Sequence, residues 1–255
     1  MRFLPKSFSS LSQVLWETRK ATAALGKLES PTDELSHKAY EAALHKIGVD
    51  WSENLFKILG LEMNVSGAQV SKEPTLFVAN HVGYVDIPLM VHATSGAFVA
   101  KKEVKSFPFF GAGAEKYGTV FVDRASPEAR RKVASLIGEF IKTRKKNVIL
   151  FPEGTSSPWG VEWKRGAFAI AKQANIPVQP LRIAYSPQEK VAYWGDHFLP
   201  VHLLGLLKHG SFKADVEIFE PQMISDVEKD TALIQEKIQN SLKEKLSSWG
   251  EWRAP

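Results

Sequence analysis

Short apolar runs that end in polar residues recur along this chain from residue 74 onward, and segments of helical periodicity separate them. The runs read as buried strands, which we expect at 75–79, 97–100, 119–122, 148–151, 178–184 and 216–219. The helices between and after them are expected at 87–93, 126–145, 165–174 and 231–246. Strands that alternate with helices predict the α/β class, with a mixed, mostly buried sheet flanked by helices. Polar side chains gather just after strand ends, where open α/β sheets usually bind their ligands.

The first 65 residues carry a helical pattern instead. Apolar residues recur at helical spacing over 7–27, and a second helical stretch starts near Ser30, which can cap it, with Pro31 at its first position. We therefore expect an N-terminal helical extension, 1–65, followed by an α/β domain, 66–255. The extension is either a packing element or an amphipathic contact with a membrane surface, and the pattern leaves both open.

Basic residues gather in clusters, and the formal net charge is +5 at pH 7. Such clusters suit an anionic partner, which is a nucleic acid, an anionic membrane surface or a phosphorylated substrate. Lys101, Lys102 and Lys105 lie among aromatic and apolar residues, which favours a binding role for them. The clusters at 130–132 and 142–146 fit solvated helix faces.

Several classes of site are excluded or disfavoured by composition. Cysteine is absent, so the chain has no disulfide, no thiolate metal site and no cysteine nucleophile. The histidines show no spacing of the His-Glu-x-x-His type, and no metal is expected. No run approaches the roughly 18 apolar residues that a spanning helix needs. If the protein acts on lipids, we expect it to lie on a membrane rather than through it.

The segment that follows the first strand, Asn80 to Asp86, combines a histidine with a carboxylate. His81 can take a proton near neutral pH, and a carboxylate beside it can fix its tautomer and stabilise its cationic form. Gly83 permits a sharp turn that could fold Asp86 back onto His81. The alternative is that Asp86 caps a helix, with Pro88 in its first turn. No nucleophile accompanies the pair, so His81 would activate a substrate hydroxyl.

Three further segments favour the catalytic interpretation. One strand leads into Asp123-Arg124, a second into Glu153-Gly154-Thr155, and a third starts between Pro177 and Pro180. Taken singly, these segments fit a surface ion pair, a turn and an ordinary strand entry. Their order after the histidine segment is what makes them informative.

These four blocks resemble the glycerolipid acyltransferase family, typified by 1-acylglycerol-3-phosphate acyltransferases. That family is marked by Asn-His-x4-Asp, a strand ending in Asp-Arg, Phe-Pro-Glu-Gly-Thr and a proline-rich strand entry, in this order. The resemblance covers roughly residues 70–185 and makes 66–255 the acyltransferase domain. His-x4-Asp alone is unspecific, whereas the four ordered blocks are specific.

The resemblance implies a reaction and its participants. His81, paired with Asp86, would be the general base that lets an acceptor hydroxyl attack a thioester, without a covalent acyl-enzyme. The acyl donor would be acyl-CoA or acyl carrier protein, and no cofactor is implied. The enzyme would work at the cytoplasmic face of a membrane as a peripheral or monotopic protein. The substrate-binding residues would be Arg124, Glu153, Gly154 and Thr155, with added positive charge from Lys101 and Lys105.

One departure bears on the acceptor. Many family members that form phosphatidic acid continue Glu-Gly-Thr with Arg-Ser, whereas this chain has Ser156-Ser157. We expect 1-acylglycerol-3-phosphate as the acceptor, with lyso-ornithine lipid or another lysolipid as the alternative. A non-catalytic module that binds membranes or nucleic acid is the alternative of another class. No nucleic-acid fold motif appears, so no nucleic-acid partner is expected.

Overall fold

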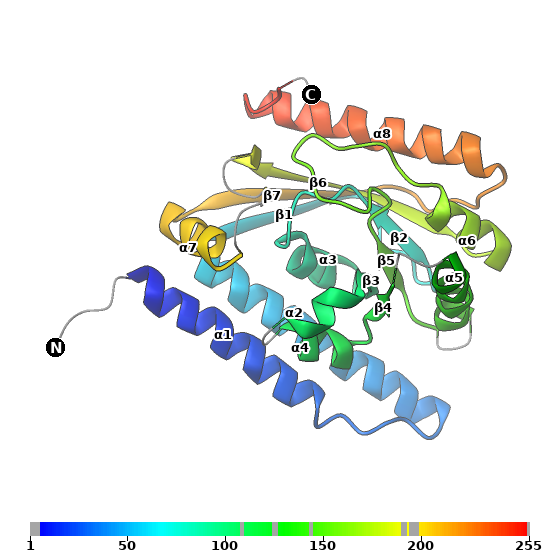
Figure 1. Cartoon of the computed structure of the whole chain (residues 1–255), viewed down its shortest axis with the longest axis horizontal. Coiled ribbons are helices and arrows are strands. Elements are labelled where there is room, and N and C mark those ends of the chain that lie inside the picture. Colours follow the sequence, from blue (N-terminus) through cyan, green and yellow to red (C-terminus); the bar gives the residue numbers. More distant parts are fainter. Residues whose placement is uncertain are drawn as a thin grey trace.

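A seven-stranded sheet in the order β1-β7-β6-β2-β5-β3-β4 forms the centre of the protein (Figure 1). The computed structural model describes residues 6–107, 110–123, 127–142, 145–189, 193 and 199–253. All neighbouring strands are parallel except β6 and β7, which are antiparallel, and this confirms the expected mixed α/β fold. The strands are β1 (Leu61–Gly67), β2 (Leu76–Ala79), β3 (Ala97–Lys101), β4 (Val120–Val122), β5 (Val148–Leu150), β6 (Val178–Ser186) and β7 (Phe212–Ile218).

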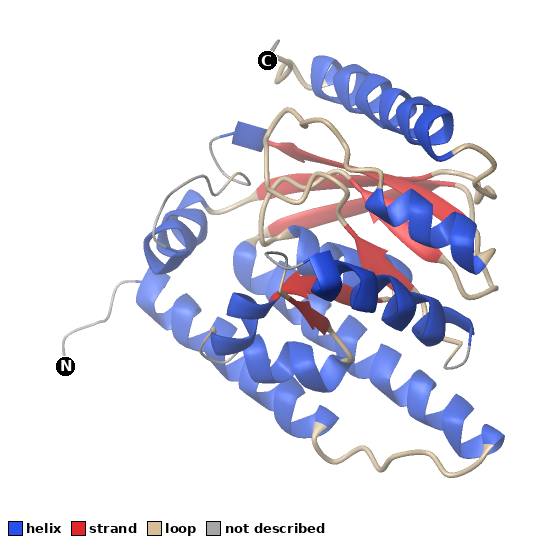
Figure 2. Ribbon diagram, turned by 45° about the vertical axis from the view of Figure 1, so that its right-hand side comes forward, coloured by secondary structure: helices blue, strands red, loops and turns tan. Residues whose placement is uncertain are grey.

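Helices cover both faces of the sheet and make three layers (Figure 2). One layer contains α5 (Pro127–Lys142), α6 (Gly166–Ala174) and α8 (Val227–Ser248). The other contains α1 (Lys6–Leu25), α2 (Glu34–Leu59), α3 (Asp86–Thr94), α4 (Phe110–Tyr117) and α7 (Leu199–His209), with the short 3-10 helix η1 (Lys102–Ser106) after β3.

The central strands send alternate side chains into the two layers. On β2, Phe77 and Ala79 belong to the core beneath α1, α2, α3 and α7, whereas Leu76 and Val78 belong to the core beneath α5, α6 and α8. All four side chains are fully buried. A strand buried on both faces has a continuous apolar sequence, which explains why the run at 75–79 was recognisable.

The N-terminal helices are part of the main core rather than a separate extension. The expected boundary at residue 65 falls inside β1, which pairs with β7 over its whole length. Leu44, Leu55 and Leu59 of α2 are buried in the same core as the strands. The helical part of the N-terminal segment therefore ends before Leu61. It forms a helical layer of the same fold, and β1 belongs to the sheet.

The start of α2 also differs from the expected one. Asp33, rather than Ser30, is the N-cap: its side chain accepts the amide of Ser36 at 2.8 Å, and the Ser36 hydroxyl oxygen accepts the amide of Asp33 at 3.1 Å. This reciprocal capping box satisfies two amides that the first helical turn leaves free. The helix then continues without a break to Leu59.

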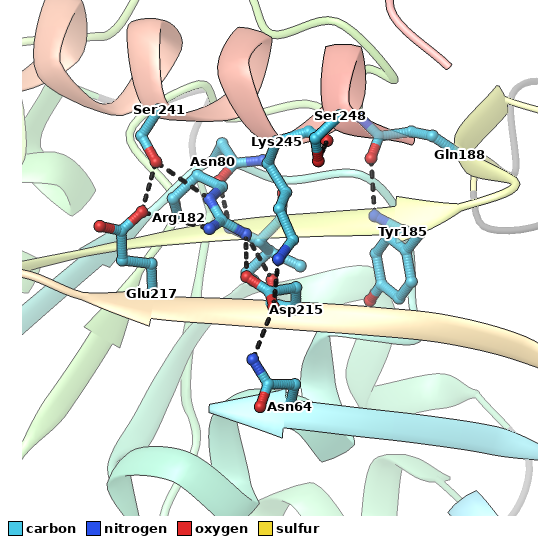
Figure 3. A network of polar contacts seen from close by, with 11 residues as sticks. Asn64, Asn80, Arg182, Tyr185, Gln188, Asp215, Glu217, Ser241, Lys245 and Ser248 are labelled. Carbon is cyan, nitrogen blue, oxygen red and sulfur yellow. Dashed lines mark hydrogen bonds and ion pairs between the residues drawn. The ribbon is translucent and has the colours of Figure 1, made fainter. Parts of the chain in front are cut away.

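A buried charge network joins β6 and β7 to α8 (Figure 3). Arg182 lies 2.8 Å from Asp215 and 3.1 Å from Glu217, and Lys245 lies 2.7 Å from Asp215. Burial raises the pKa of Asp215, but hydrogen bonds from Lys245, Asn64 and Arg182 together hold it below its usual value. The network fixes α8 over the antiparallel pair.

The short apolar segment at 201–207 lies in α7. Leu203 and Leu206 are buried, whereas Val201 is 62% exposed, so one face of this helix is core. In the described part of the chain, the helices are too short or too polar to serve as a membrane span.

Candidate active site

The turn between β2 and α3 brings His81 and Asp86 together as expected. Nδ1 of His81 lies 2.7 Å from Oδ2 of Asp86. The same oxygen accepts the amide hydrogens of Val82 at 2.7 Å and Gly83 at 3.1 Å. Asp86 is fully buried, while the side chain of His81 is 22% exposed. The carboxylate is therefore fixed behind the imidazole, and the imidazole faces outward.

The helix-cap alternative for Asp86 does not describe this geometry. Val85 occupies the N-cap of α3, no side chain caps that helix, and Asp86 is its first residue. The carboxylate binds the amides of the preceding turn instead. An Nδ1–H that donates to Asp86 leaves the lone pair of the imidazole on Nε2, which is the arrangement that a general base needs.

The second motif lies against the first. The ring of Phe151 stacks on the His81 ring with centroids 4.1 Å apart and an angle of 12° between the planes. The Ser157 amide donates to the carbonyl oxygen of His81 at 2.8 Å. Gly154 has a φ of 70°, a left-handed conformation that favours glycine. The loop after β5 is thereby held on the histidine turn.

Glu153 lies beneath this loop rather than in open solvent. It is 2% exposed, and neither carboxyl oxygen makes a hydrogen bond of normal geometry with the described residues. Burial raises the pKa of Glu153 to about 8, although the His81 amide and the Trp163 side chain lie near enough to lower it in part. This raised pKa favours the neutral form of the Glu153 carboxyl group at neutral pH. Its contact with an acceptor head group stays a prediction.

His81 opens onto a cavity of about 430 Å³ between the sheet and the helices α1, α2, α3, α4 and α7. Its walls are mostly apolar, with Leu25, Trp51, Leu55 and Val91 among them. Polar groups are confined to few places, among them the histidine and the Gly154-Thr155-Ser156 turn. An apolar cavity with a base at its wall can accommodate a hydrocarbon chain beside a reacting group.

The remaining expected substrate-binding residues have different positions. Lys101 and Thr155 are both exposed, and both line the cavity. Lys105 is exposed and forms an ion pair with Glu115 at 2.7 Å. Arg124 lies outside the described residues. No cluster of three or more potential metal ligands occurs within the described ranges.

Two residues around the pair had no role assigned from sequence. The side-chain amide of Asn80 donates to the Ile183 carbonyl at 2.8 Å and accepts the Ile183 amide at 2.7 Å. The hydroxyl of Tyr185 donates to Oδ1 of Asp86 at 2.6 Å. Both contacts join the histidine turn to β6, about 100 positions along the chain, and no local sequence pattern signals them.

Comparisons with known proteins agree with the resemblance. A sequence profile described as Acyltransferase matches residues 62–184. The chain is 34% identical to a lyso-ornithine lipid O-acyltransferase of Pseudomonas aeruginosa over 67% of both chains. It is 31% identical to a 1-acyl-sn-glycerol-3-phosphate acyltransferase of Saccharomyces cerevisiae over 50% of this chain and 44% of that protein. The crystal structure of the 1-acyl-sn-glycerophosphate acyltransferase of Thermotoga maritima has the same fold, with a TM-score of 0.68, 22% identity, and coverage of 98% of this chain and 100% of that one.

Proposed function

The chain belongs to the acyltransferase family, and we propose that it transfers a fatty acyl chain from a thioester donor to the free hydroxyl of a lysolipid, with His81 as the general base. The observation that carries this proposal is the hydrogen-bonded pair of His81 and Asp86 at the wall of an apolar cavity. Asp86 holds the imidazole in one tautomer and stabilises the imidazolium that forms during the reaction.

The proposed reaction has two proton transfers. Nε2 of His81 takes the proton of the acceptor hydroxyl while the oxygen attacks the thioester carbonyl, which gives a tetrahedral oxyanion. The carbon–sulfur bond then breaks, the ester is released, and the imidazolium returns its proton to the leaving thiolate. The Gly154-Thr155-Ser156 turn, which lines the cavity with His81, supplies candidate backbone donors for the oxyanion.

We assign the apolar cavity to a hydrocarbon chain of the substrates. Its volume of about 430 Å³ lies within the range of ligand pockets, and most of the described residues that line it are apolar. Lys101, at the cavity wall and exposed, is suited to an anionic group of the donor or the acceptor. Acyl-CoA and acyl carrier protein remain the two candidate donors.

Two acceptors are supported by different observations. Lyso-ornithine lipid is favoured by the relative that matches over 67% of this chain and by Ser156, which stands where an arginine often contacts a phosphate. The 1-acylglycerol-3-phosphate that we first expected is favoured by the yeast relative, which matches over 50%. We place lyso-ornithine lipid first because serine offers no cation to a phosphate.

We further propose that the enzyme lies on the cytoplasmic face of a membrane as a peripheral or monotopic protein. Trp16 of α1 is 64% exposed and Val201 of α7 is 62% exposed, on two helices that border the cavity. Exposed tryptophan is favourable at a membrane interface because its ring is apolar and its N–H can be solvated. Flotation with anionic vesicles tests this: Trp16→Ser should reduce binding, while Leu233→Ser on α8, which is 51% exposed in the other helical layer, should not.

The activity is tested with the purified full chain, both thioester donors and a panel of lysolipids. We expect acyl transfer by the wild type and a loss of at least about 10³-fold in kcat for His81→Ala. His209→Ala, at the end of α7 and exposed, is the matched control and should keep full activity. Equal turnover by His81→Ala and the wild type would refute the assignment of the base.

The same panel separates the alternatives. A strong preference for 1-acylglycerol-3-phosphate would reverse the order of the two acceptors. Binding to vesicles or DNA without turnover on any acceptor would support the non-catalytic module instead. Retention on DNA and flotation with vesicles, measured in one buffer, distinguish those two kinds of binding.

A further inference from the structure

Asp86 uses its two carboxylate oxygens for different partners. Oδ2 accepts from His81 and from the amides of Val82 and Gly83, all of which belong to the same turn. Oδ1 accepts a hydrogen bond from the hydroxyl of Tyr185 at 2.6 Å. Because Asp86 is fully buried, water does not replace this donor. The orientation of the carboxylate plane thus depends on a phenol from another strand.

Tyr185 is held so that its hydroxyl has little freedom. It is fully buried near the end of β6, which pairs with β7 through residue 186. Its backbone amide donates to the side-chain oxygen of Gln188 at 2.8 Å (Figure 3). The Gln188 amide group in turn donates to the carbonyl oxygen of Pro158, in the loop that follows Glu153. One strand end therefore contacts both the pair and the active-site loop.

The register between β6 and the histidine turn is fixed independently. Asn80, next to His81, makes two hydrogen bonds to the backbone of Ile183, two residues before Tyr185. Residues two apart on a strand face the same side of the sheet, and the side chains of Ile183 and Tyr185 both lie in the core beneath α1, α2, α3 and α7, the layer that contains Asp86. The contact between Tyr185 and Asp86 depends on the strand order, because β6 is the direct neighbour of β2.

The phenol remains a donor over the range in which the enzyme could work. Burial, followed by the charge of Asp86 and the hydrogen bond to it, raises the pKa of Tyr185 well above its usual value. Among the described residues, the titratable groups near the pair include Tyr84 in the same turn, which contacts His202 of α7, and Glu153 in the loop after β5.

We propose that Tyr185 is a positioning residue that orients Asp86 and acts through it on His81. Tyr185 thereby extends the catalytic pair to three hydrogen-bonded side chains, which come from the ends of β2 and β6. This inference rests on the proposed role of His81. The hydroxyl withdraws part of the negative charge of Asp86 and fixes the oxygen that faces the imidazole. Loss of the hydroxyl leaves Oδ1 without its donor and makes the carboxylate a stronger acceptor from His81.

The test is a double-mutant cycle with Tyr185→Phe and Asp86→Asn in the full chain. Tyr185→Phe should lower kcat about tenfold with little change in KM, and it should move the acid limb of the pH profile of kcat/KM to higher pH. In the Asp86→Asn background, the same change should have an effect of less than about twofold, because its target is already altered. Tyr40→Phe, which removes a phenol outside the cavity, is the control and should leave all parameters unchanged.

Each other outcome overturns the inference. Additive effects of the two substitutions would show that Tyr185 does not act through Asp86. An unmoved pH profile with a uniform loss of activity, or a variant that no longer unfolds cooperatively, would give the phenol a purely structural role. These results are distinct from failure of the proposed function, which would appear as undiminished turnover in His81→Ala.

Discussion

The ring of His81 lies parallel to the ring of Phe151, at 4.1 Å between centroids, so that the histidine turn and the loop after β5 form one surface. The stack sits at the strand ends of β2 and β5, which are direct neighbours in the sheet. It leaves the Nδ1 edge of the imidazole to Asp86 and supports the ring face from one side. The two sequence blocks are thus coupled through a pair of ring faces as well as through the backbone.

Removal of the aromatic face at position 151 should loosen the imidazole. Phe151→Leu keeps an apolar side chain but loses the stack, which is worth about 0.5–1.5 kcal/mol beyond area burial. We expect kcat to fall by roughly 2- to 12-fold, measured under saturating substrate. Phe219→Leu, in the opposite core, should leave kcat per folded molecule unchanged. An unaltered kcat in Phe151→Leu would show that the stack does not fix the base.

Asn80 should be required for both stability and activity. Asn80→Ala leaves the buried amide and carbonyl of Ile183 without partners, at about 1–3 kcal/mol for each group. We expect a lower free energy of unfolding in urea and a lower kcat, because the register of the histidine turn against β6 is lost.

Asn147→Ala is the matched control for that substitution. The Asn147 side chain likewise makes two hydrogen bonds to backbone, with Thr75 and Thr94, but at the amino ends of the strands. It should destabilise the fold without lowering kcat of the folded fraction. Equal kcat values for the two variants would mean that Asn80 has no special relation to the site.

The sequence predicted those strands whose burial shapes their composition. Phe77 and Val78 face opposite cores and are both fully buried, so β2 is apolar throughout. β1 was not predicted from the sequence because it is an edge strand with little burial. Leu61 is the only buried residue of this strand, and Asn64 and Ser66 interrupt any apolar pattern.

The site divides in the same way. His81 and Asp86 are five positions apart in one turn, so their contact could be predicted from local spacing. Tyr185 reaches Asp86 across 99 positions, and only the adjacency of β6 and β2 brings them together. The burial of Glu153 also depends on the loop packed over it, which the Glu-Gly-Thr sequence alone does not specify.

Narrowing the cavity at Gly48 should shorten the preferred acyl chain. A Cβ at this position of α2 would lie 2.8 Å from both the Tyr117 ring and Val91, in the wall of the cavity. Gly48→Ala should therefore displace Tyr117 and lower kcat/KM for palmitoyl donors more than for decanoyl donors. The overpacking would also cost roughly 1–3 kcal/mol of stability.

The control for that substitution is Gly205→Ala on α7, where no described atom outside the backbone of that helix lies within 4 Å of the added Cβ. It should gain helix propensity and leave the ratio of the two donors unchanged. If Gly48→Ala also left the ratio unchanged, the cavity would not be the site of the acyl chain.

Glu153 should make stability depend on pH in an unusual direction. The pKa of its buried carboxyl group is raised to about 8, whereas the unfolded chain releases this proton near the ordinary value of 4.5. Between these pH values the native state binds more protons than the unfolded state, so the contribution of Glu153 to stability falls as pH rises and levels off above 8. The carboxylates of Asp33, Asp215 and Asp230, whose pKa values are lowered, titrate below this window.

Glu153→Gln should remove this dependence, because an amide has no proton to lose. At pH 5 the variant and the wild type should have similar Tm values, while at pH 9 the variant should be more stable by about 3–5 kcal/mol, at 1.36 kcal/mol for each pKa unit. Thermal unfolding across this range measures the difference, which corresponds to roughly 2–4 °C for each kcal/mol. Glu162→Gln, which alters an exposed neighbour, should run parallel to the wild type. A constant difference between Glu153→Gln and the wild type from pH 5 to 9 would show that Glu153 ionises in the native protein as it does in the unfolded chain.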